Sequence, residues 1–460
     1  MEDGALDRKN KLERIDKINA VSPSFCLAKW LQVTIDLLHG TNHSCHHPNR
    51  HQTPLEELKD NPSALHNTKF KKRLRKEMLE GVRPSECEYC WQVEDVTSSE
   101  PSDRHIKSID NWAFPHLDRI AKLPWDADVD PTYVEVMFDK SCNLACAYCI
   151  SDISSSIEAE IKKYGAFEML DSHRLSRHEP VVKVGEVNPY VEAFWKWLPA
   201  IYKNLSTLRI TGGEPLLSAN TFKVLDFFEK NPNSELTLAL NCNLSVRDEI
   251  LDKFLDRLEV ILTNNCIKTC DFYISVDTYG DQAEYIRKNL DYKKFISNIS
   301  KLKDRFPEMQ IVINATYGIY SIPKFKKLLE QVYELKLKYS KIIIDTSYLS
   351  HPKYLRANMV TEDFHPVIKE CLEYMGERSG EFGKSGFSDH ELEKLTRVYH
   401  WVIAKRTPEE HNQNRADFYT FMTQLDERYP GSFMESFPEY ENFWAYCKKS
   451  FYFIKKLTKE

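Results

Sequence analysis

Between residues 131 and 355, short apolar runs alternate with longer amphipathic stretches. The six candidate strands are YVEVMF, TLRIT, LTLALN, FYISV, QIVINATY and KIIIDTSYL, and helical segments such as YVEAFWKWLPAIYKNL and ANTFKVLDFFEKN lie between them. Strands that alternate with helices predict a parallel sheet with right-handed crossovers. Six such units favour an α/β fold with a partial (β/α)6 barrel of the TIM type. A doubly wound open sheet is the competing topology.

The rest of the chain divides into four segments by composition. We expect a polar tail at 1–20, a cysteine-rich module at 21–95, a linker rich in Ser, Pro and Asp at 96–130, and an aromatic-rich helical C-terminal region at 356–460. The cysteine-rich module contains a predicted hairpin, LQVTIDLLHGTNHSC, that turns at Gly40. The barrel would therefore be flanked by a small module before it and a helical region after it.

Charge and hydropathy argue against two broad classes of protein. The net charge of −6 is not that of a general polyanion binder. The basic segment at 69–76 would suit a nucleic acid, but a solvated helix face is the favoured interpretation. The sequence contains no run of eighteen apolar residues that would span a membrane, and its N-terminus lacks the apolar core of a signal peptide. We therefore expect a cytoplasmic protein with no membrane partner.

Twelve cysteines are many for a reducing compartment, where metal ligation or catalysis explains thiols better than disulfides do. Three of them, Cys142, Cys146 and Cys149, lie within eight residues, directly after the first predicted barrel strand. A closed structural zinc site needs four ligands, and no histidine lies within this loop. Three thiolates on a cubane iron–sulfur cluster instead leave one iron open. Three incidental buried cysteines are the weaker interpretation.

Two more polar groups follow other strands of the predicted sheet. The strand TLRIT runs into Gly212, Gly213 and Glu214, and FYISV ends at Ser275 with Asp277 just beyond it. In α/β barrels, reactive groups lie on the loops at the C-terminal ends of the strands. We therefore expect these residues and the cysteine triplet to meet at one edge of the sheet.

CNLACAYC followed by ITGGEP resembles the radical S-adenosylmethionine (radical SAM) enzymes over residues 131–355. The resemblance implies that Cys142, Cys146 and Cys149 bind a [4Fe-4S] cluster whose open iron takes S-adenosylmethionine. It further implies reductive cleavage of this cofactor to a 5'-deoxyadenosyl radical, which abstracts hydrogen from a substrate. A flavodoxin or ferredoxin-like partner would supply the electron.

The same resemblance implies cofactor-binding positions at Tyr148, Gly212, Gly213, Glu214, Ser275, Asp277 and Asn314. Tyr148 corresponds to an aromatic residue near the adenine, and the Gly-Gly-Glu segment to the part that binds the methionyl amino group. Glycines let a backbone approach a ligand closely, and an ionised Glu214 accepts hydrogen bonds from an ammonium group. Ser275 corresponds to a polar position near the ribose, with Asp277 close by. Asn314 would contact the methionyl carboxylate or the ribose, or serve as a structural polar residue.

A second set of four cysteines precedes the barrel: Cys26, Cys45, Cys87 and Cys90. Four thiolates close a site completely, either around zinc or around a cubane cluster. Their layout resembles the SPASM and twitch auxiliary-cluster modules of radical SAM enzymes, although in most relatives the module follows the barrel. The resemblance favours a second [4Fe-4S] cluster over zinc. His43, His46 and His47 crowd this set and are expected to form a polar rim.

The other five cysteines are expected to be small apolar core residues. Cys242 is a candidate for the barrel mouth because it ends the third predicted strand.

The function favoured by these features is a radical SAM enzyme that modifies a peptide or protein. Modification of a nucleotide, nucleic acid or sugar is the enzymatic alternative. A non-catalytic metal-binding regulatory protein is the second alternative, which the presence of Glu214 and Ser275 disfavours.

Overall fold

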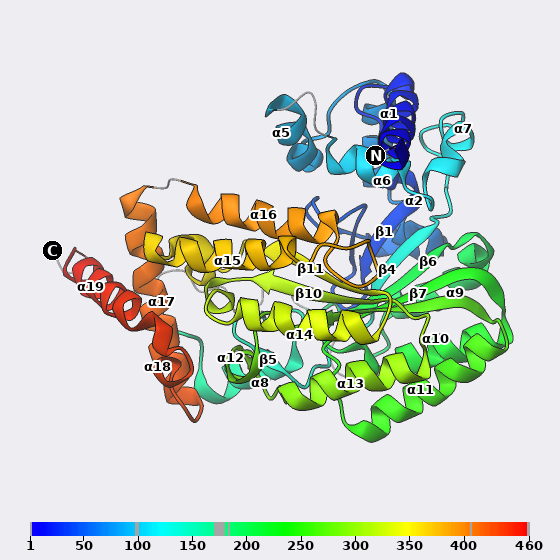
Figure 1. The fold of residues 1–460 in the computed structure, drawn as a ribbon. Helices are drawn as coiled ribbons and strands as arrows, with labels where there is room; N and C mark the ends of the chain where they lie inside the picture. The colour runs from blue at the N-terminus through cyan, green and yellow to red at the C-terminus, as the bar shows by residue number, and fades with distance from the viewer. Residues whose placement is uncertain (1, 97–100, 170–179, 183–184, 405–406, 458–460) are drawn as a thin grey trace.

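The computed structural model describes residues 2–96, 101–169, 180–182, 185–404 and 407–457 (Figure 1). Its centre is a parallel sheet of six strands: β4 (Tyr133–Met137), β6 (Thr207–Thr211), β7 (Asn233–Cys242), β8 (Ile267–Ser275), β10 (Ile311–Tyr317) and β11 (Ile342–Tyr348). They lie in the order β11-β10-β8-β7-β6-β4, and each coincides with a predicted strand.

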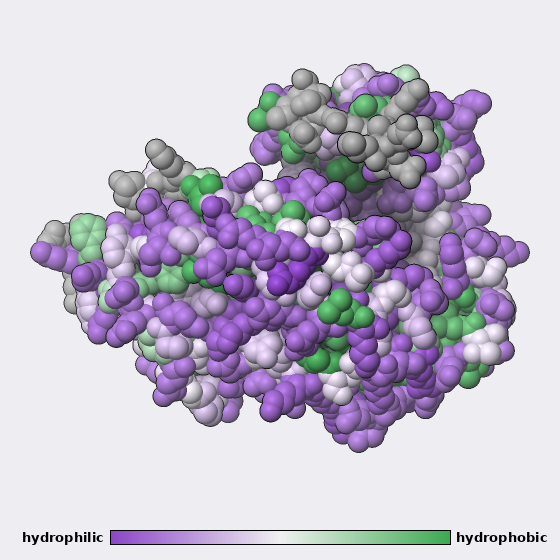
Figure 2. Space-filling view, in the orientation of Figure 1, coloured by the Kyte–Doolittle hydropathy of each residue, from purple (hydrophilic) through white to green (hydrophobic). Residues whose placement is uncertain are grey.

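Helices follow these strands as the alternation predicted. They are α8 (Ser155–Tyr164), α9 (Pro189–Ile201), α10 (Ala219–Lys230), α11 (Asp248–Thr263), α12 (Gly280–Ile286), α13 (Tyr292–Arg305) and α14 (Phe325–Lys338). Local signals place their ends: α9 begins after Asn188, whose side chain accepts hydrogen bonds from two backbone N–H groups of the first turn. The outer surface over α11, α13 and α14 is mainly hydrophilic, as expected of helices that bury one face (Figure 2).

The two faces of the sheet differ in polarity. On β6, Leu208 and Ile210 are buried in the main core, while Arg209 and Thr211, which alternate with them, are partly exposed. Strand β8 shows the same alternation at its C-terminal half. A doubly wound sheet would be apolar on both faces because helices cover both. One apolar and one polar face instead match a partial barrel with its helices outside, so the predicted fold class is confirmed.

The cysteine-rich module adds three strands to this sheet. β1 (Gln32–Asp36) and β2 (Thr41–His43) form the predicted antiparallel hairpin, and β3 (His51–Gln52) pairs with β2. β1 also pairs in parallel with β4, and Asp36 lies opposite Met137. The module is therefore continuous with the barrel sheet, an arrangement that the sequence pattern did not indicate.

The segment expected to be a polar tail forms the helix α1 (Glu2–Val21), and the module also contains α2 (Ala28–Leu31), α3 (Leu55–Leu58), α4 (Lys69–Leu79) and α5 (Glu88–Val96). The segment expected to be a linker, 96–130, differs from that expectation in its described part. It carries α6 (Asp103–Ile109) and α7 (Leu117–Ile120), and Ala113, Leu117 and Ile120 belong to a second hydrophobic core formed with α1 and α2. Its polar composition reflects the exposed side of short helices, because Ala113, Leu117 and Ile120 are buried, although Ile106 and Trp125 are exposed.

The C-terminal region is helical, as predicted. It contains α15 (His365–Gly376), α16 (Asp389–Ile403), α17 (Pro408–Arg428), α18 (Phe433–Ser436) and α19 (Glu441–Leu457). In Figure 1, α15 and α16 lie along the β11 side of the sheet, and α17 to α19 gather at the end away from the N-terminal module. Among the described helices, none is long and apolar enough to cross a bilayer.

The buried carboxylate of Glu391 connects helix α16 to α14 by an ion pair and to β11 by a hydrogen bond. Glu391 lies 2.8 Å from the Nζ atom of Lys336 on α14, and both side chains are fully buried. The same carboxylate accepts a hydrogen bond from the backbone N–H of Ile344 on β11, at 2.8 Å. One acidic side chain thus joins two helices and the edge of the sheet.

We expect Glu391→Ala to lower the free energy of unfolding by about 3–5 kcal/mol, because it leaves the Lys336 ammonium buried without a partner. Denaturant unfolding followed by circular dichroism measures this change. Glu393→Ala, at an exposed position of the same helix, is the control and should cost less than about 0.5 kcal/mol. Equal losses in the two variants would contradict this role for the buried pair.

Candidate active site and second cysteine site

The cysteine triplet lies on the loop that leaves the C-terminal end of β4. Hydrogen bonds hold its first part: the Cys142 N–H donates to Ser155 Oγ at 3.0 Å, and Ser156 Oγ donates to the Cys142 carbonyl at 2.6 Å. Both serines begin α8. Further along, the Cys149 N–H donates to the Cys146 carbonyl at 3.0 Å. The loop is therefore anchored at the start of α8, and all three cysteines are partly exposed.

A two-stranded sheet braces the middle of this loop. β5 (Ala145–Cys146) pairs antiparallel with β9 (Arg287–Lys288), so that Cys146 lies opposite Arg287. The guanidinium of Arg287 donates to Cys146 Sγ at 3.8 Å and also contacts the hydroxyl of Tyr148. This arginine is buried, and sequence reasoning missed it because nothing in its local sequence indicates a contact with a loop 141 residues away.

Asp277 holds this arginine in place. Its two carboxylate oxygens accept hydrogen bonds from Arg287 Nε at 2.8 Å and from Arg287 Nη2 at 3.1 Å. They also accept from the Tyr148 hydroxyl at 3.1 Å and from the Thr316 N–H at 3.0 Å. The predicted cofactor-binding residues Asp277 and Tyr148 are thus brought together, and a cation beside Cys146 links them. Their contact with a cofactor stays a prediction.

The glycines after β6 pack against the start of the cysteine loop. A Cβ on Gly213 would lie 2.3 Å from the Ser141 carbonyl oxygen, and a Cβ on Gly212, which has a φ of +125°, would lie 2.7 Å from the Asp139 carbonyl oxygen. Both distances are shorter than any normal contact. These positions therefore require glycine for the approach of two protein loops, and their role toward S-adenosylmethionine stays a prediction.

Glu214 is buried at the centre of the same group of loops. Its carboxylate accepts from the Asn243 N–H at 2.6 Å and from the Leu216 N–H at 3.1 Å. Burial raises the pKa of Glu214 to about 7, although these two hydrogen bonds act against the rise. Asn243, which follows β7, in turn places its side-chain amide 4.0 Å from Cys142 Sγ. Glu214 therefore orders the loop next to the triplet, whatever ligand it also binds.

Ser275 and Asn314 lie next to each other at the same edge. They are direct partners across β8 and β10, and both side chains are partly exposed. Tyr148 stacks on Tyr320, with ring centroids 5.9 Å apart. Six of the predicted cofactor positions thus lie at or after the C-terminal ends of β4, β6 and β8, whereas Asn314 lies in the middle of β10. Their contact with S-adenosylmethionine stays a prediction.

The donor chemistry of the triplet fits an iron–sulfur cluster, because three soft thiol ligands share one braced loop. Burial raises the pKa of Cys142 to about 11, and the neighbouring Cys146 adds to the rise. A metal that takes these sulfurs as thiolates must therefore displace protons. Among the described residues, no three Cys, His, Asp or Glu side chains form a preformed metal site.

The four N-terminal cysteines come together from three separate segments, because Cys87 and Cys90 lie three residues apart. All of them line one pocket, with Lys29, Arg104 and Lys107 also in its wall. Burial, together with the charges of Cys26 and Cys45, raises the pKa of both Cys87 and Cys90 to about 12. The structure thus brings together the set that the sequence grouped. Their metal ligation stays a prediction.

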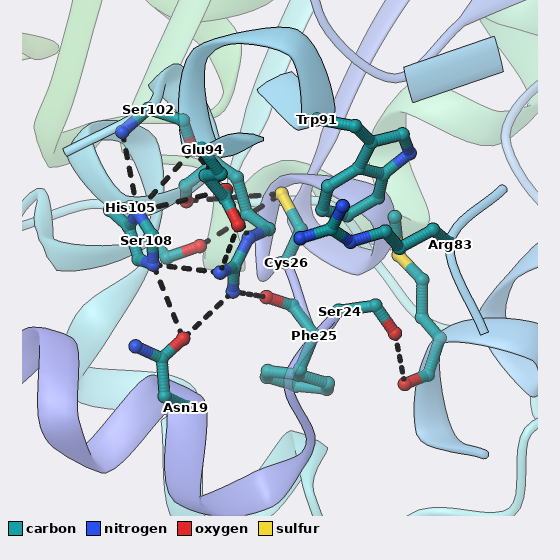
Figure 3. Close-up of polar contacts among 12 residues, drawn as sticks. Asn19, Ser24, Phe25, Cys26, Arg83, Trp91, Glu94, Ser102, His105 and Ser108 are labelled. Atoms are coloured by element: carbon teal, nitrogen blue, oxygen red, sulfur yellow. Dashed lines mark hydrogen bonds and ion pairs between the residues drawn. The ribbon is translucent and has the colours of Figure 1, made fainter. Parts of the chain in front are cut away.

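A buried arginine organises this second site (Figure 3). Arg104 forms two hydrogen bonds with the Glu94 carboxylate, at 2.9 and 3.0 Å. It also donates to the Phe25 carbonyl at 2.8 Å and to Asn19 Oδ1 at 3.0 Å. Phe25 directly precedes Cys26, and Glu94 lies one helical turn after Cys90 on α5. One guanidinium therefore positions the segments that carry two of the four cysteines.

Lys29 places a second positive charge at these thiols. It is buried and forms an ion pair with Glu86. Burial alone lowers the pKa of Lys29, but the nearby Cys87, Glu86 and Cys45 raise it above its usual value. A positive charge among four cysteines favours the thiolate form that binds metals.

A polar cavity of about 710 Å³ lies between the two cysteine sets. His47 and Pro48 line both this cavity and the pocket of the four cysteines, while Ile150 and Asp152 enter it from the cysteine loop. Glu135 of β4 lines its wall as well. His47 pairs with Asp103 and stacks on Tyr89, with ring centroids 3.7 Å apart. The histidines next to Cys45 thus form a polar rim of the cavity.

Cys242 does not face the barrel mouth. It is buried in the main hydrophobic core at the end of β7, and burial raises its pKa well above the usual value. Cys266, Cys270, Cys371 and Cys447 are also buried in this core, as expected.

No family model and no curated protein matches this chain. Streptococcus suis SuiB, solved with its precursor peptide SuiA, is 14% identical over 84% of this chain and 78% of its own, with a TM-score of 0.38. Native anSMEcpe with bound AdoMet is 16% identical over 53% of this chain and 61% of its own (TM-score 0.32). TYW1 with a lysine-pyruvate adduct bound is 16% identical over 51% of this chain and 70% of its own (TM-score 0.26). The chain thus spans less than two thirds of anSMEcpe.

Because these sequence identities and TM-scores are low, the functional assignments for this chain rest on its own residues.

We expect Gly213→Ala to destabilise the protein by about 1–3 kcal/mol, because the added methyl group overlaps the Ser141 carbonyl oxygen and must displace the cysteine loop. Gly376→Ala is the control: its added Cβ would meet no atom within 4 Å. Thermal unfolding of both variants measures the difference. Tolerance of alanine at both positions would contradict the close packing of these loops.

Proposed function

We propose that this chain is a radical SAM enzyme in which Cys142, Cys146 and Cys149 hold a [4Fe-4S] cluster. One observation carries the proposal. The three thiols share a loop at the C-terminal edge of a partial barrel, and the two glycines that follow the neighbouring strand pack directly against the start of that loop. A structural metal site needs a fourth protein ligand, which this loop does not contain.

The bound cofactor supplies the radical chemistry, because a reduced cluster cleaves S-adenosylmethionine to a 5'-deoxyadenosyl radical. The protein holds and shields the reactants. Glu214 orders the loop that borders Cys142, and Arg287 places a positive charge at Cys146. Tyr148, Ser275 and Asn314 offer an aromatic ring and polar groups at the same edge for the adenosyl and methionyl parts.

A second [4Fe-4S] cluster on Cys26, Cys45, Cys87 and Cys90 is part of the proposal. The positive charges of Lys29 and Arg104 at this pocket would offset the negative charge of four thiolates. Zinc would use the same ligands. Reduction by a flavodoxin or ferredoxin-like partner, and a cytoplasmic location, stay predictions from the sequence.

We infer that the substrate is a peptide or protein rather than a nucleotide or nucleic acid. Phosphate recognition depends on available Lys and Arg side chains. Arg50, the sole Lys or Arg among the described residues that line the cavity, pairs with Asp36 at 2.7 Å. Burial lowers the pKa of His43 to about 4 and of His46 to about 3, so both are neutral at pH 7. Among the described residues that line the cavity, none therefore offers an unpaired Lys or Arg to a phosphate, and Arg209, beside the cavity on β6, packs on the ring of Tyr273.

Production of 5'-deoxyadenosine tests the proposed function. The full chain is reconstituted anaerobically with iron and sulfide, reduced with dithionite and supplied with S-adenosylmethionine, and the products are separated by chromatography. The proposal predicts 5'-deoxyadenosine that depends on the reductant. A fully loaded, reduced protein that leaves the cofactor intact, with and without peptide pools, would favour the non-catalytic alternative.

Single cysteine variants should separate the two metal sites. We expect Cys146→Ala to abolish 5'-deoxyadenosine formation and to remove about four irons, because one ligand of a three-cysteine cluster is lost. Cys87→Ala should instead remove the metal of the N-terminal site and leave the triplet's iron in place. Iron and zinc are counted by plasma mass spectrometry.

Wild-type protein should contain about eight irons for two clusters, or about four irons and one zinc if the second site binds zinc. Cys242→Ala, in the hydrophobic core, is the matched control and should keep all the metal. Loss of both sets of metal from Cys146→Ala alone would contradict two independent sites.

A further inference from the structure

A row of polar side chains crosses the inner face of the sheet beside the cavity. Thr34 of β1 lies directly opposite Glu135 of β4, and Glu135 lies opposite Arg209 of β6. Partners in adjacent strands point to the same face, so these three side chains are neighbours. Asn241 of β7 lies on the same face, opposite Tyr273, whose ring lies 3.8 Å beneath the Arg209 guanidinium.

Each member of this row has a buried polar atom without a hydrogen-bond partner among the described residues. These atoms are Thr34 Oγ1, Glu135 Oε2, Arg209 Nε and Asn241 Oδ1. Glu135 is 9% exposed and lines the cavity. Buried polar groups in folded proteins are almost always satisfied, so four unsatisfied atoms on neighbouring strands point to a bound group that completes them.

The charges of the row define the chemistry of that group. Glu135 and Arg209 are adjacent, but the guanidinium packs on Tyr273 instead of forming an ion pair with the carboxylate. His46 Nδ1 lies 4.0 Å from Glu135 Oε2, which is beyond hydrogen-bond distance. A cation placed between the two would be repelled by Arg209, and an anion by Glu135.

A neutral group with one hydrogen-bond donor and one acceptor satisfies both Glu135 and Arg209. An amide offers its N–H to the Glu135 carboxylate and its C=O to the Arg209 guanidinium. Burial raises the pKa of Glu135, and the positive charge of Arg209 opposes the rise. A protonated carboxyl group would also pair with an amide, since it too donates and accepts, but it would not repel an anion, so the predicted preference for the amide over an anion is that of an ionised Glu135.

We propose that Glu135, in the wall of the cavity, and Arg209, next to it on β6, form an amide-binding subsite that holds a peptide group, or a carboxamide side chain, of the substrate at this edge of the cavity. Thr34 and Asn241 flank this subsite with a further hydroxyl and carbonyl oxygen. The inference rests on the proposed function in that it names the part of a peptide substrate that the enzyme holds. The binding itself requires neither cluster nor S-adenosylmethionine.

Three fluorinated probes of similar size test this subsite with the full-length protein: 3-(4-fluorophenyl)propionamide, 3-(4-fluorophenyl)propionate and 3-(4-fluorophenyl)propylammonium. Binding is measured by fluorine NMR line broadening as each probe is titrated. We expect the wild-type protein to bind the neutral amide at least about fivefold more tightly than either charged probe. A preference for the anion or the cation would overturn the proposal.

Two variants locate the binding. Glu135→Met and Arg209→Met keep an unbranched side chain but remove its charge and hydrogen bonds, so each should weaken binding of the amide about fivefold or more. Glu135→Met removes the charge that repels the anionic probe, so the affinity for the anion should rise relative to that for the amide. Arg209→Met removes the charge that repels the cationic probe, so the affinity for the cation should rise in the same way. Unchanged amide binding in a folded variant of either kind would overturn the proposal. If one variant does not fold, the other variant and the wild-type ranking still decide.

Glu235→Met, at an exposed position on β7, is the matched control and should bind all three probes as the wild-type protein does. Cleavage of S-adenosylmethionine is measured on the same wild-type preparation. If S-adenosylmethionine is not cleaved but the probes bind in the predicted order, the proposed enzyme activity is refuted and the amide subsite stands. If S-adenosylmethionine is cleaved but the probes bind in another order, only the subsite is refuted.

Discussion

The parallel pairing of β1 with β4 is the interaction on which the arrangement of the two cysteine sites depends. β4 leads directly into the cysteine triplet, and Cys26 lies shortly before β1. Because the two strands are adjacent and in register, the N-terminal module continues the barrel sheet and cannot move as a separate body without breaking the ladder. The pairing also places the histidines beside Cys45 at the cavity that the triplet loop borders. A module that precedes the barrel thereby reaches its inner face.

Buried positive charges recur beside the cysteines. Arg287 contacts Cys146 and is held by Asp277, while Arg104 is held by Glu94 next to the segment that carries Cys26. Lys29 lies among the thiols of the second site. Cations stabilise thiolates, and each cation has a fixed carboxylate partner that keeps it in position. Both cysteine sites thus hold fixed cations that would offset part of the charge of thiolate ligands, while burial raises the pKa of Cys142, Cys87 and Cys90.

Local sequence patterns predicted much of this structure. All six barrel strands and the hairpin at Gly40 follow from the period of their apolar residues, and the edge that carries Cys142, Glu214 and Ser275 follows from the parallel topology. Local sequence patterns could not predict contacts between residues that are far apart in the chain. Arg287 reaches Cys146 across 141 residues, and β1 joins β4 across about a hundred. The helices within 103–120 were also missed, because short polar helices carry a weak periodic signal.

A cluster bound by three protein thiolates leaves one iron for S-adenosylmethionine, and electron–nuclear double resonance observes that bond directly. The protein is reconstituted anaerobically, reduced, and mixed with S-adenosylmethionine that carries nitrogen-15 at its amino group. A nitrogen-15 coupling to the reduced cluster is the predicted result. A cluster that shows no coupling to the label, and whose fourth iron is instead bound by a protein side chain, would contradict the account.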